Sequence, residues 1–180
     1  GGFGLEMAQQ VVADESTEPM LDEWAVLDVL GALVDRSLVI ADAGEPPRYR
    51  MLESPRAYAL EQLAGAGEDT AWRRRHAHAV LKHLTAVNED CWGGRIGVDN
   101  AIKLLEKDLD NGREALTWAL ANDPQAAVAA GPAMELALTY VRRGELLNVW
   151  EATTKLITDT MPVSLRADWA AGYARFWTAE

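Results

Sequence analysis

Apolar residues in the second half of the chain recur every three or four positions, a spacing that places them along one side of an α-helix. The clearest stripe consists of Ile102, Leu105, Leu109, Gly112 and Leu116. Comparable stripes run through residues 72–87, 127–141, 147–161 and 165–176. The pattern predicts successive helices of about 15–20 residues, each with one apolar side.

Turn-forming residues separate these predicted helices. The breaks are CWGGRIG at 91–97, NDP at 122–124, Gly144, and Pro162 after Met161. Glycine and proline interrupt helices, so we expect helices 123–142 and 144–160 to form a pair and 164–179 to begin another. Stacked helical hairpins are typical of an α-solenoid, although no residue-by-residue repeat is visible.

The first part of the chain has a different pattern. Apolar spacing predicts helices at 5–13 and 22–35, separated by the turn-rich stretch DESTEP at 14–19. SLVIADA and RYRML lack a helical period and flank the turn-forming stretch AGEPP at 43–47. Two short strands joined by such a turn predict a β-hairpin.

A helix is expected to follow the hairpin directly, over residues 55–64. The Ser54 hydroxyl is expected to act as its N-cap, and Pro55 to occupy the first helical position, where a missing N–H is harmless. Glu53 is expected to tie the hairpin to this helix. The sequence therefore predicts a mostly α chain, with a winged-helix-like domain and a small β-hairpin at 1–67, followed by an α-helical, TPR-like hairpin array at 68–180.

The charge balance is acidic and uneven. The chain carries 28 acidic and 17 basic side chains, for a formal net charge of −11. Residues 1–47 hold ten acids and one base, whereas residues 48–83 hold seven bases and four acids. An acidic surface repels nucleic acid unless its basic residues are segregated, and here the segregation is mild.

Cysteine content and hydropathy indicate a cytoplasmic protein without membrane contact. Cys91 is the only cysteine, so no internal disulfide can form, as is usual in a reducing compartment. No apolar run approaches the ~18 residues of a membrane-spanning helix. The chain begins GGFGLEMAQQ, without an initiator methionine or signal peptide, which indicates a fragment of a longer protein.

Catalytic and cofactor-binding motifs are missing from the sequence. It contains neither the GxxxxGK[ST] loop that binds a triphosphate nor the GxSxG turn of a serine nucleophile. GGFG at 1–4 lacks a preceding strand, so we interpret it as a tight turn before the first helix rather than as a phosphate-binding loop. We expect no enzymatic activity and no cofactor in this segment.

The histidines and the cysteine do not form a convincing metal site. His76 and His83 share a helical face, but His78 points elsewhere and Cys91 lies beyond the helix. A tetrahedral zinc site needs closer convergence than this. We expect His76 and His83 to fill the buried edge of the helix, each with one hydrogen bond, and we expect no metal.

The most basic stretch is RRRH, with Arg73, Arg74 and Arg75. One interpretation is a contact for phosphate or for an acidic partner. The other is a solvated helix face, with Glu68 and Asp69 just upstream as ion-pair partners. We favour the second, since charge runs are usually solvated.

A winged-helix-like domain raises the possibility of DNA binding through its second helix, which would enter the major groove. Here that helix, 22–35, carries four acidic residues and no basic residue. The hairpin adds only Arg48 and Arg50 as cations. Carboxylates facing a phosphate backbone oppose association, so direct nucleic-acid binding is not the favoured expectation.

Five stretches resemble, in order, consecutive landmarks of one family: GGFGLEMAQQVVA, VLDVLGALVDRSLV, RYRMLESPRAYALEQLAGAGE, RRRHA and LEKDLDNGREALTWAL. They are similar to the region that follows the nucleotide-binding domain in bacterial STAND-type (NB-ARC-like) signal-transduction ATPases, many of which are transcriptional regulators. The resemblance is strongest over 1–120. It weakens afterwards, where members of the family carry TPR-like repeats.

The resemblance implies a layout for the longer protein. An ATPase core would lie upstream, and the winged helix would pack on it and report its nucleotide state. The helical array would sense an unknown protein or ligand, and an effector domain, often DNA-binding, would lie elsewhere. The partners implied are thus the protein's own upstream nucleotide-binding domain and whatever the array binds.

The sequence departs from the family pattern at three places, the first of which covers two residues. Related eukaryotic members carry Met-His-Asp at the strand-to-helix junction, and the matching residues here are Met51, Leu52 and Glu53. Leucine cannot donate a hydrogen bond to phosphate, so no nucleotide-binding residue is carried over. Pro55 replaces a bulky aliphatic residue. Gly112 stands where the family prefers leucine, and we expect a close helix crossing or a bend there.

The expected function is therefore regulatory and non-catalytic. The hairpin and the helix from Ser54, held rigid by the cap and by inward packing of Tyr58 and Leu63, would transmit the state of the upstream domain to the array. Opening the array would release a surface for a partner. Two alternatives stay open: DNA binding by the winged helix with 48–83 as the contact, and a stand-alone peptide-binding scaffold without an ATPase.

Overall fold

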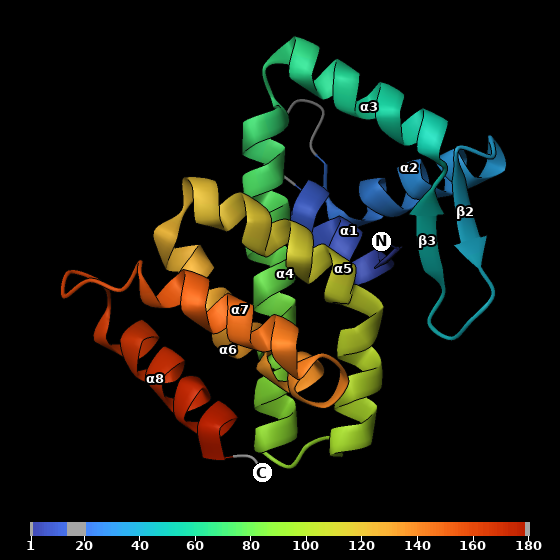
Figure 1. Cartoon of the computed structure of the whole chain (residues 1–180). Coiled ribbons are helices and arrows are strands. Elements are labelled where there is room, and N and C mark those ends of the chain that lie inside the picture. Colours follow the sequence, from blue (N-terminus) through green and yellow to red (C-terminus); the bar gives the residue numbers. More distant parts are fainter. Residues whose placement is uncertain (1, 14–20, 179–180) are drawn as a thin grey trace. The chain divides into compact units, whose positions relative to one another are not determined.

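The computed structural model describes residues 2–13 and 21–178, and it is mostly helical with one small antiparallel sheet (Figure 1). This confirms the predicted fold class of a mostly α chain with a small hairpin. The chain divides into two compact units, residues 1–79 and 80–180, and the division falls inside a long helix. The predicted boundary at residue 67 stays a prediction, and the DESTEP stretch lies outside the described residues.

The first unit contains a three-stranded sheet with the order β1-β3-β2. Its strands are β1 (Phe3–Gly4), β2 (Val39–Asp42) and β3 (Arg48–Met51). The hairpin of β2 and β3 confirms the prediction, but the interpretation of GGFG as a tight turn misses β1: Phe3 pairs with Tyr49 in the sheet and stacks on its ring at 6.0 Å. Two residues are too few to show the alternation that indicates a strand.

Two helices pack with this sheet, α1 (Leu5–Val12) and α2 (Glu23–Asp35). The helix predicted at 22–35 is confirmed with its start marked by Asp22, whose Oδ1 accepts a hydrogen bond from the Ala25 backbone N–H at 2.7 Å. This side-chain cap satisfies one of the amides that an isolated helix end leaves without a partner. Val26 and Leu30 are the residues that α2 buries.

Helix α3 (Glu53–Ala66) begins earlier than predicted. Leu52 occupies the N-cap position with extended backbone angles, no side chain caps the helix, and Ser54 and Pro55 lie inside the first turn. The prediction that Ser54 caps the helix is therefore wrong. The backbone amides of the first turn have no partner within the helix, so proline is tolerated at several positions of that turn. Pro55 therefore does not identify the first residue of α3. The helix runs to Ala66, past the predicted end at 64, so Gly65 lies inside it; Gly67 is its C-cap, left-handed with φ 71°.

The inward packing predicted for α3 is also wrong for Tyr58, whose side chain is 64% exposed. Leu63 is half-buried, and α3 as a whole buries no residue. The sequence of α3 mixes alanine with charged and polar residues around the helix, so it lacks the apolar stripe that would bind it to a core.

The second unit is built from helices alone, and α6 is at its centre. The elements are the later part of α4 (Asp69–Trp92), then α5 (Val98–Asn122), α6 (Pro124–Val141), α7 (Arg143–Thr154) and α8 (Val163–Thr178). Helix α6 packs against α5, α7 and α8 (Figure 1). Asp123 alone connects α5 to α6, and its carboxylate caps α6 by accepting from the Ala126 N–H at 3.1 Å.

The predicted pair at 123–142 and 144–160 is present as α6 and α7, but α7 is shorter than predicted. It ends at Thr154, although the apolar spacing continues to Met161. In its last turn the hydroxyls of Thr153 and Thr154 donate to backbone carbonyls of Val149 and Trp150, a local bonding mode that competes with helix continuation. Beyond Thr154, Ile157 and Met161 keep the apolar spacing because a loop places their side chains in partly or fully buried positions, and not because the helix continues.

Glycines set how closely these helices approach. A Cβ added at Gly112 would lie 3.1 Å from Leu84 Cδ1 and 3.5 Å from Met134 Cε, which confirms the close crossing expected there. A Cβ at Gly131 would overlap the ring of Trp150, and one at Gly172 would lie 2.9 Å from Trp150 Cη2. Trp150 is completely buried, so these two glycines form a slot that admits its indole.

Candidate functional site

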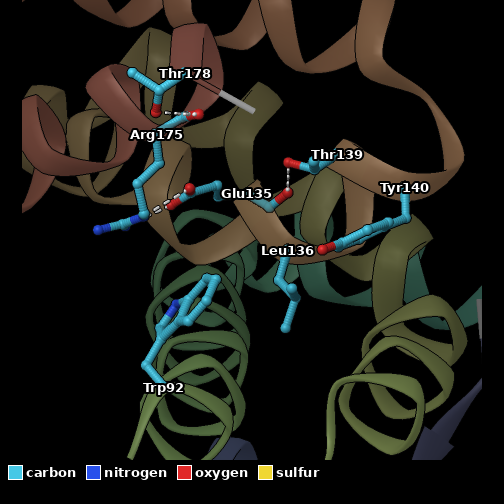
Figure 2. Close-up of a pocket in the computed structure, with 7 residues that line it drawn as sticks. All are labelled: Trp92, Glu135, Leu136, Thr139, Tyr140, Arg175 and Thr178. Atoms are coloured by element: carbon cyan, nitrogen blue, oxygen red, sulfur yellow. Dashed lines mark hydrogen bonds and ion pairs between the residues drawn. The ribbon is translucent and has the colours of Figure 1, made fainter. Parts of the chain in front are cut away.

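A shallow pocket of about 210 Å³ lies in the helical unit, at the ends of three helices. Figure 2 shows Arg175, Glu135 and Trp92 toward one side and Leu136 and Tyr140 toward the other. Thr139 and Thr178 complete the lining. Trp92 ends α4, Thr178 ends α8, and the other lining residues come from the last two turns of α6 and from α8.

An ion pair forms the polar wall of the pocket. Arg175 donates from Nε to Glu135 Oε1 at 2.9 Å and from Nη2 to Glu135 Oε2 at 2.6 Å. Glu135 is only 4% exposed, whereas the Arg175 side chain is 44% exposed. The hydrogen bonds from Arg175 to Glu135 raise the pKa of the guanidinium, which therefore stays charged. Two parallel hydrogen bonds fix the plane of the guanidinium as well as its position.

Trp92 makes a second contact with Arg175, through its aromatic ring. The Arg175 guanidinium carbon lies 5.4 Å from the centroid of the Trp92 ring, within the range of a cation–π contact. The Trp92 side chain is still 55% exposed. Arg175 is therefore held by a buried carboxylate and an aromatic ring, which orients it within the pocket wall without shielding it from solvent.

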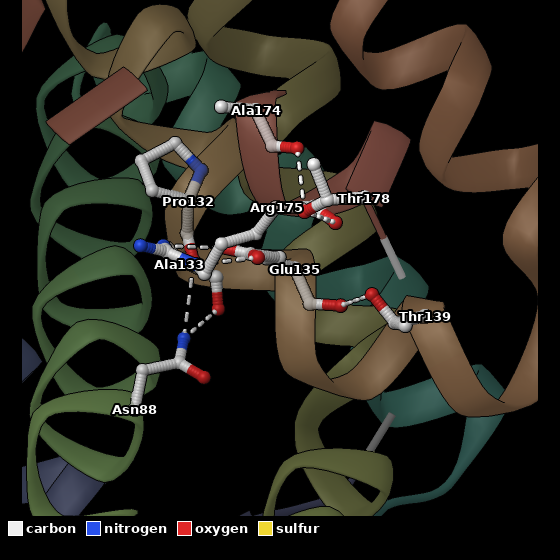
Figure 3. Close-up of polar contacts among 8 residues, drawn as sticks. All are labelled: Asn88, Pro132, Ala133, Glu135, Thr139, Ala174, Arg175 and Thr178. Atoms are coloured by element: carbon white, nitrogen blue, oxygen red, sulfur yellow. Dashed lines mark hydrogen bonds and ion pairs between the residues drawn. The ribbon is translucent and has the colours of Figure 1, made fainter. Parts of the chain in front are cut away.

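Behind the pocket, Asn88 joins α4 to α6 (Figure 3). Its Nδ2 donates to the carbonyl of Pro132 at 3.2 Å and to that of Ala133 at 2.7 Å. Pro132 lies inside α6, and the hydrogen bonds from Asn88 reach the helix at this proline and at the residue after it. The helix turn that carries Glu135 and Thr139 is thereby tied to α4, which carries Trp92.

The residues predicted as site residues in the first unit do not converge on a pocket. Glu53 and Ser54 are exposed and Pro55 is half-buried, all in the first turn of α3. Arg73 pairs with Asp69 at 2.9 Å, which agrees with the favoured interpretation of a solvated helix face. The other predicted partner, Glu68, accepts instead from the Trp72 indole N–H at 3.2 Å.

The remaining arginines of this cluster differ in their surroundings. Arg75 donates from Nη2 to the Ala13 carbonyl at 2.7 Å and lies 4.9 Å from the centroid of the Trp72 ring, so it has a structural role. Arg74 is exposed, and no contact of its side chain is seen in the described part of the chain. Within the cluster, Arg74 is therefore the residue best placed to contact a partner.

The cations of the hairpin also have structural contacts. Arg48 donates from Nη2 to the Gly2 carbonyl at 2.7 Å, and Arg50 pairs with Asp42 at 3.5 Å. On α2 the side chains of Trp24 and Val29 are exposed beside the exposed acids Glu23 and Asp28. This surface combines apolar and acidic groups, which suits a protein contact better than a phosphate backbone.

The three histidines and Cys91 differ in how far they are buried. His76 and His83 are half-buried and His78 is exposed, while the Cys91 thiol is buried. His83 Nε2 lies 3.5 Å from Asp108 Oδ2, and Asp108 Oδ1 also accepts from Asn111 at 3.1 Å. Over residues 2–13 and 21–178, no three histidine, cysteine or acidic side chains come together as a metal site would require.

Sequence reasoning missed the Glu135–Arg175 pair. The two residues are 40 positions apart, and neither belongs to a motif. One signal was available: Glu135 is the only charged residue of α6, between Met134 and Leu136 in an otherwise apolar helix. A lone acid on a buried helix normally has a partner, although its identity depends on the fold.

Within the described ranges, none of the helices has the length and apolar character needed to span a lipid bilayer. The chain matches no protein-family model and no solved structure.

The chain is similar to segments of much longer mycobacterial proteins. It is 37% identical over 124 residues to a protein of Mycobacterium tuberculosis (strain ATCC 25618 / H37Rv) named "Putative HTH-type transcriptional regulator", and equally so to a protein of that name from Mycobacterium bovis (strain ATCC BAA-935 / AF2122/97). An uncharacterized protein of M. tuberculosis H37Rv is 34% identical over 99 residues. The first two alignments cover 68% of this chain but 13% of each relative, and the third covers 54% and 23%. For the first two relatives, the shared region is therefore one segment of a protein named as an HTH-type transcriptional regulator.

Proposed function

We propose that this chain is a non-catalytic, regulatory segment of a transcriptional regulator. The observation that carries the proposal is its 37% identity over 124 residues to one segment of proteins named as HTH-type regulators. In this role, residues 1–79 connect the segment to neighbouring domains, and the helical unit 80–180 binds a partner or ligand. The pocket beside Glu135 and Arg175 is a concave surface of the helical unit that could take such a ligand.

The finer proposal is that the first unit relays the nucleotide state of an upstream ATPase domain. The order of sequence landmarks that resembles STAND-type ATPases supports it. So does the exposed apolar surface at the strand-to-helix junction and on α2, where Leu52, Trp24 and Val29 are exposed. Exposed apolar groups on a small unit favour contact with another protein surface. Because Leu52 has no hydrogen-bonding group, the relay would act through packing rather than through phosphate binding.

Direct DNA binding is the rival proposal. It is favoured by the helix-turn-helix named in the relatives and by the seven basic residues in 48–83. Against it, Arg48, Arg50 and Arg75 all have contacts within the chain, and α2 and its cap carry four acids and no base. A protein that binds DNA through phosphate contacts would instead present unpaired cations on one face.

A transcript comparison tests the proposed function. RNA sequencing would compare cells that lack the complete gene encoding this segment with cells in which it is restored. We expect a defined set of transcripts to change on deletion and to recover on complementation. An unchanged transcript profile under every growth condition tried would contradict the proposal.

A binding measurement separates the rival. The purified chain would be titrated with duplex DNA at about 50 mM and about 200 mM salt, since phosphate contacts lose affinity steeply between these concentrations. We expect no saturable binding at the lower salt concentration. Saturable, salt-dependent binding that weakens in an Arg74→Ala variant would favour direct DNA recognition instead.

A further inference from the structure

Arg175 retains hydrogen-bonding capacity at the pocket. Its Nε and Nη2 donate to Glu135, while for Nη1 no acceptor is seen among the residues that the structure describes. Figure 2 shows this other nitrogen pointing away from the Glu135 carboxylate. A guanidinium has five N–H donors in a fixed plane, so a group held by one edge presents the remaining donors in a defined direction.

The charge at this site selects the kind of acceptor that would suit those donors. Glu135 already neutralises Arg175, and its carboxylate is almost completely buried. A second carboxylate on Nη1 would lie near the Glu135 charge and be repelled by it. A neutral carbonyl oxygen accepts the same hydrogen bond without that repulsion, so the site favours a neutral acceptor over an anion.

The rest of the lining is suited to one aromatic ring. Trp92 and Tyr140 are 55% and 64% exposed at the rim, and the buried Leu136 also lines the pocket. A cavity of about 150 Å³ already holds a benzene-sized molecule, so the about 210 Å³ here holds one aromatic side chain and little more. Aromatic pairs gain from edge-to-face and offset packing, which two exposed rings at a rim make available.

We propose that this pocket binds a peptide segment of a protein partner by taking in one phenylalanine-like side chain, while a neutral main-chain carbonyl beside that residue accepts a hydrogen bond from Arg175 Nη1. The pocket is shallow and holds one ring, so the remainder of such a ligand lies outside it, as an extended peptide can. This inference deepens the proposed partner-binding role of the helical unit and rests on it. The binding itself is measured without any transcription assay.

The test uses the ¹⁵N-labelled 180-residue chain and three small probes in NMR titrations. N-acetyl-phenylalaninamide carries the ring and neutral carbonyls, N-acetyl-alaninamide lacks the ring, and N-acetyl-phenylalanine replaces the terminal amide with a carboxylate. We expect saturable shifts of the Trp92 indole N–H and of Arg175 with the first probe, with a dissociation constant on the order of 1 mM for so small a ligand. The other two probes should each bind at least about tenfold more weakly.

Two variants establish where the probe binds. Tyr140→Ala removes an exposed wall of the pocket without opening the core and should weaken N-acetyl-phenylalaninamide binding by about tenfold. Trp24→Ala is the matched control, since it removes another exposed aromatic side chain, from the other unit, and should leave binding unchanged. Arg175 is left in place because its loss would strand the buried Glu135 carboxylate.

Three results would overturn the proposal: no saturable binding of the first probe, equal binding of the alanine probe, or tighter binding of the carboxylate probe. Equal weakening by Tyr140→Ala and Trp24→Ala would overturn it as well, because the shifts would then not report on this pocket. Failure here leaves the transcript comparison unaffected. Conversely, a changed transcript profile without probe binding would place partner recognition elsewhere on the chain.

Discussion

The two compact units are stabilised in different ways. In the helical unit, large side chains such as Trp150, Leu105 and Leu138 are completely buried, and Trp150 and Trp169 meet edge to face at 5.5 Å. In the described part of the first unit, the buried apolar residues are fewer and include no aromatic side chain, and α3 buries none. Side-chain packing thus stabilises the second unit. In the first unit, local hydrogen bonding, such as the Asp22 cap and the short sheet, is more prominent. A unit with little core of its own is the one expected to depend on neighbouring domains.

The largest expected effect comes from Trp150→Ala, which removes the central side chain of the helical unit. The empty slot should lower the free energy of unfolding by about 3–5 kcal/mol. Chemical denaturation followed by circular dichroism measures this loss, and amide hydrogen exchange in α6 and α8 localises it. Trp24→Ala, which removes a 75% exposed side chain, should change stability by less than about 0.5 kcal/mol. Equal effects of the two variants would remove the contrast between the units.

Gly131→Ala should destabilise the chain by about 1–3 kcal/mol, because the added methyl group overlaps the Trp150 ring. Alanine is otherwise the better helix former, which makes the sign of the effect informative. Gly65→Ala is the matched control in α3, where a Cβ meets no atom within 4 Å. That variant should stabilise by up to about 1 kcal/mol. Thermal unfolding of both proteins gives the comparison, and stabilisation by both would argue against a tight slot.

Asp22→Ala tests the cap of α2. Loss of the hydrogen bond to the Ala25 amide should cost about 1 kcal/mol, with faster amide exchange confined to the first turns of α2. Asp22→Ser keeps a capping oxygen and should retain most of the stability. A wild-type exchange pattern in Asp22→Ala would show that α2 is held by its packing alone.

Glu145→Gln tests the ion pair between α5 and α7. Hydrogen bonds from Arg113 hold the pKa of Glu145 below its usual range. Its contribution is therefore fully present above the ordinary glutamate pKa of about 4.3 and is lost as the pH falls through the lower value in the folded state. The variant should flatten the acid side of the stability profile, by less than about 1 kcal/mol because both groups are partly exposed. Unfolding temperatures measured from about pH 2 to pH 7 give the two profiles, and identical acid limbs would contradict this account.

The smallest expected effect is that of Tyr58→Ala in α3. Because Tyr58 is 64% exposed, its removal should change the free energy of unfolding of the chain by less than about 0.5 kcal/mol. The same substitution in the complete protein would destabilise α3 more strongly if a neighbouring domain covers this ring. Denaturation of both forms, with hydrogen exchange in α3 as the readout, distinguishes a free surface from a covered one.

Periodicity predicted most of the helices, because an amphipathic helix has to place its apolar residues on one side wherever it packs. Start and stop residues were less informative. Asp22 and Asp123 cap their helices, but Ser54 lies two positions past the N-cap of α3, which is Leu52. Local preferences allow several starting points, and in the structure α3 starts directly after β3, with Leu52 alone between them.

The candidate site was much less accessible to sequence reasoning. The contact between Glu135 and Arg175 depends on how α6 and α8 cross, and that crossing depends in turn on the slot around Trp150. Periodicity reports which side of a helix is buried but not which residue of another helix faces it. The lone acid in α6 indicated only that a partner exists, whereas the fold identified it.

The slot around the indole also constrains how this segment can diverge. A side chain at position 131 or 172 requires space that Trp150 now fills, so exchange of either glycine destabilises the unit while the tryptophan remains. A smaller residue at position 150 would leave room for a side chain at both glycine positions. A single substitution therefore creates either a cavity, if Trp150 changes first, or a clash, if a glycine changes first. We therefore expect these three positions to vary together among homologous chains, and Glu135, whose carboxylate would lie 3.0 Å from a Cβ at Gly172, to vary with them.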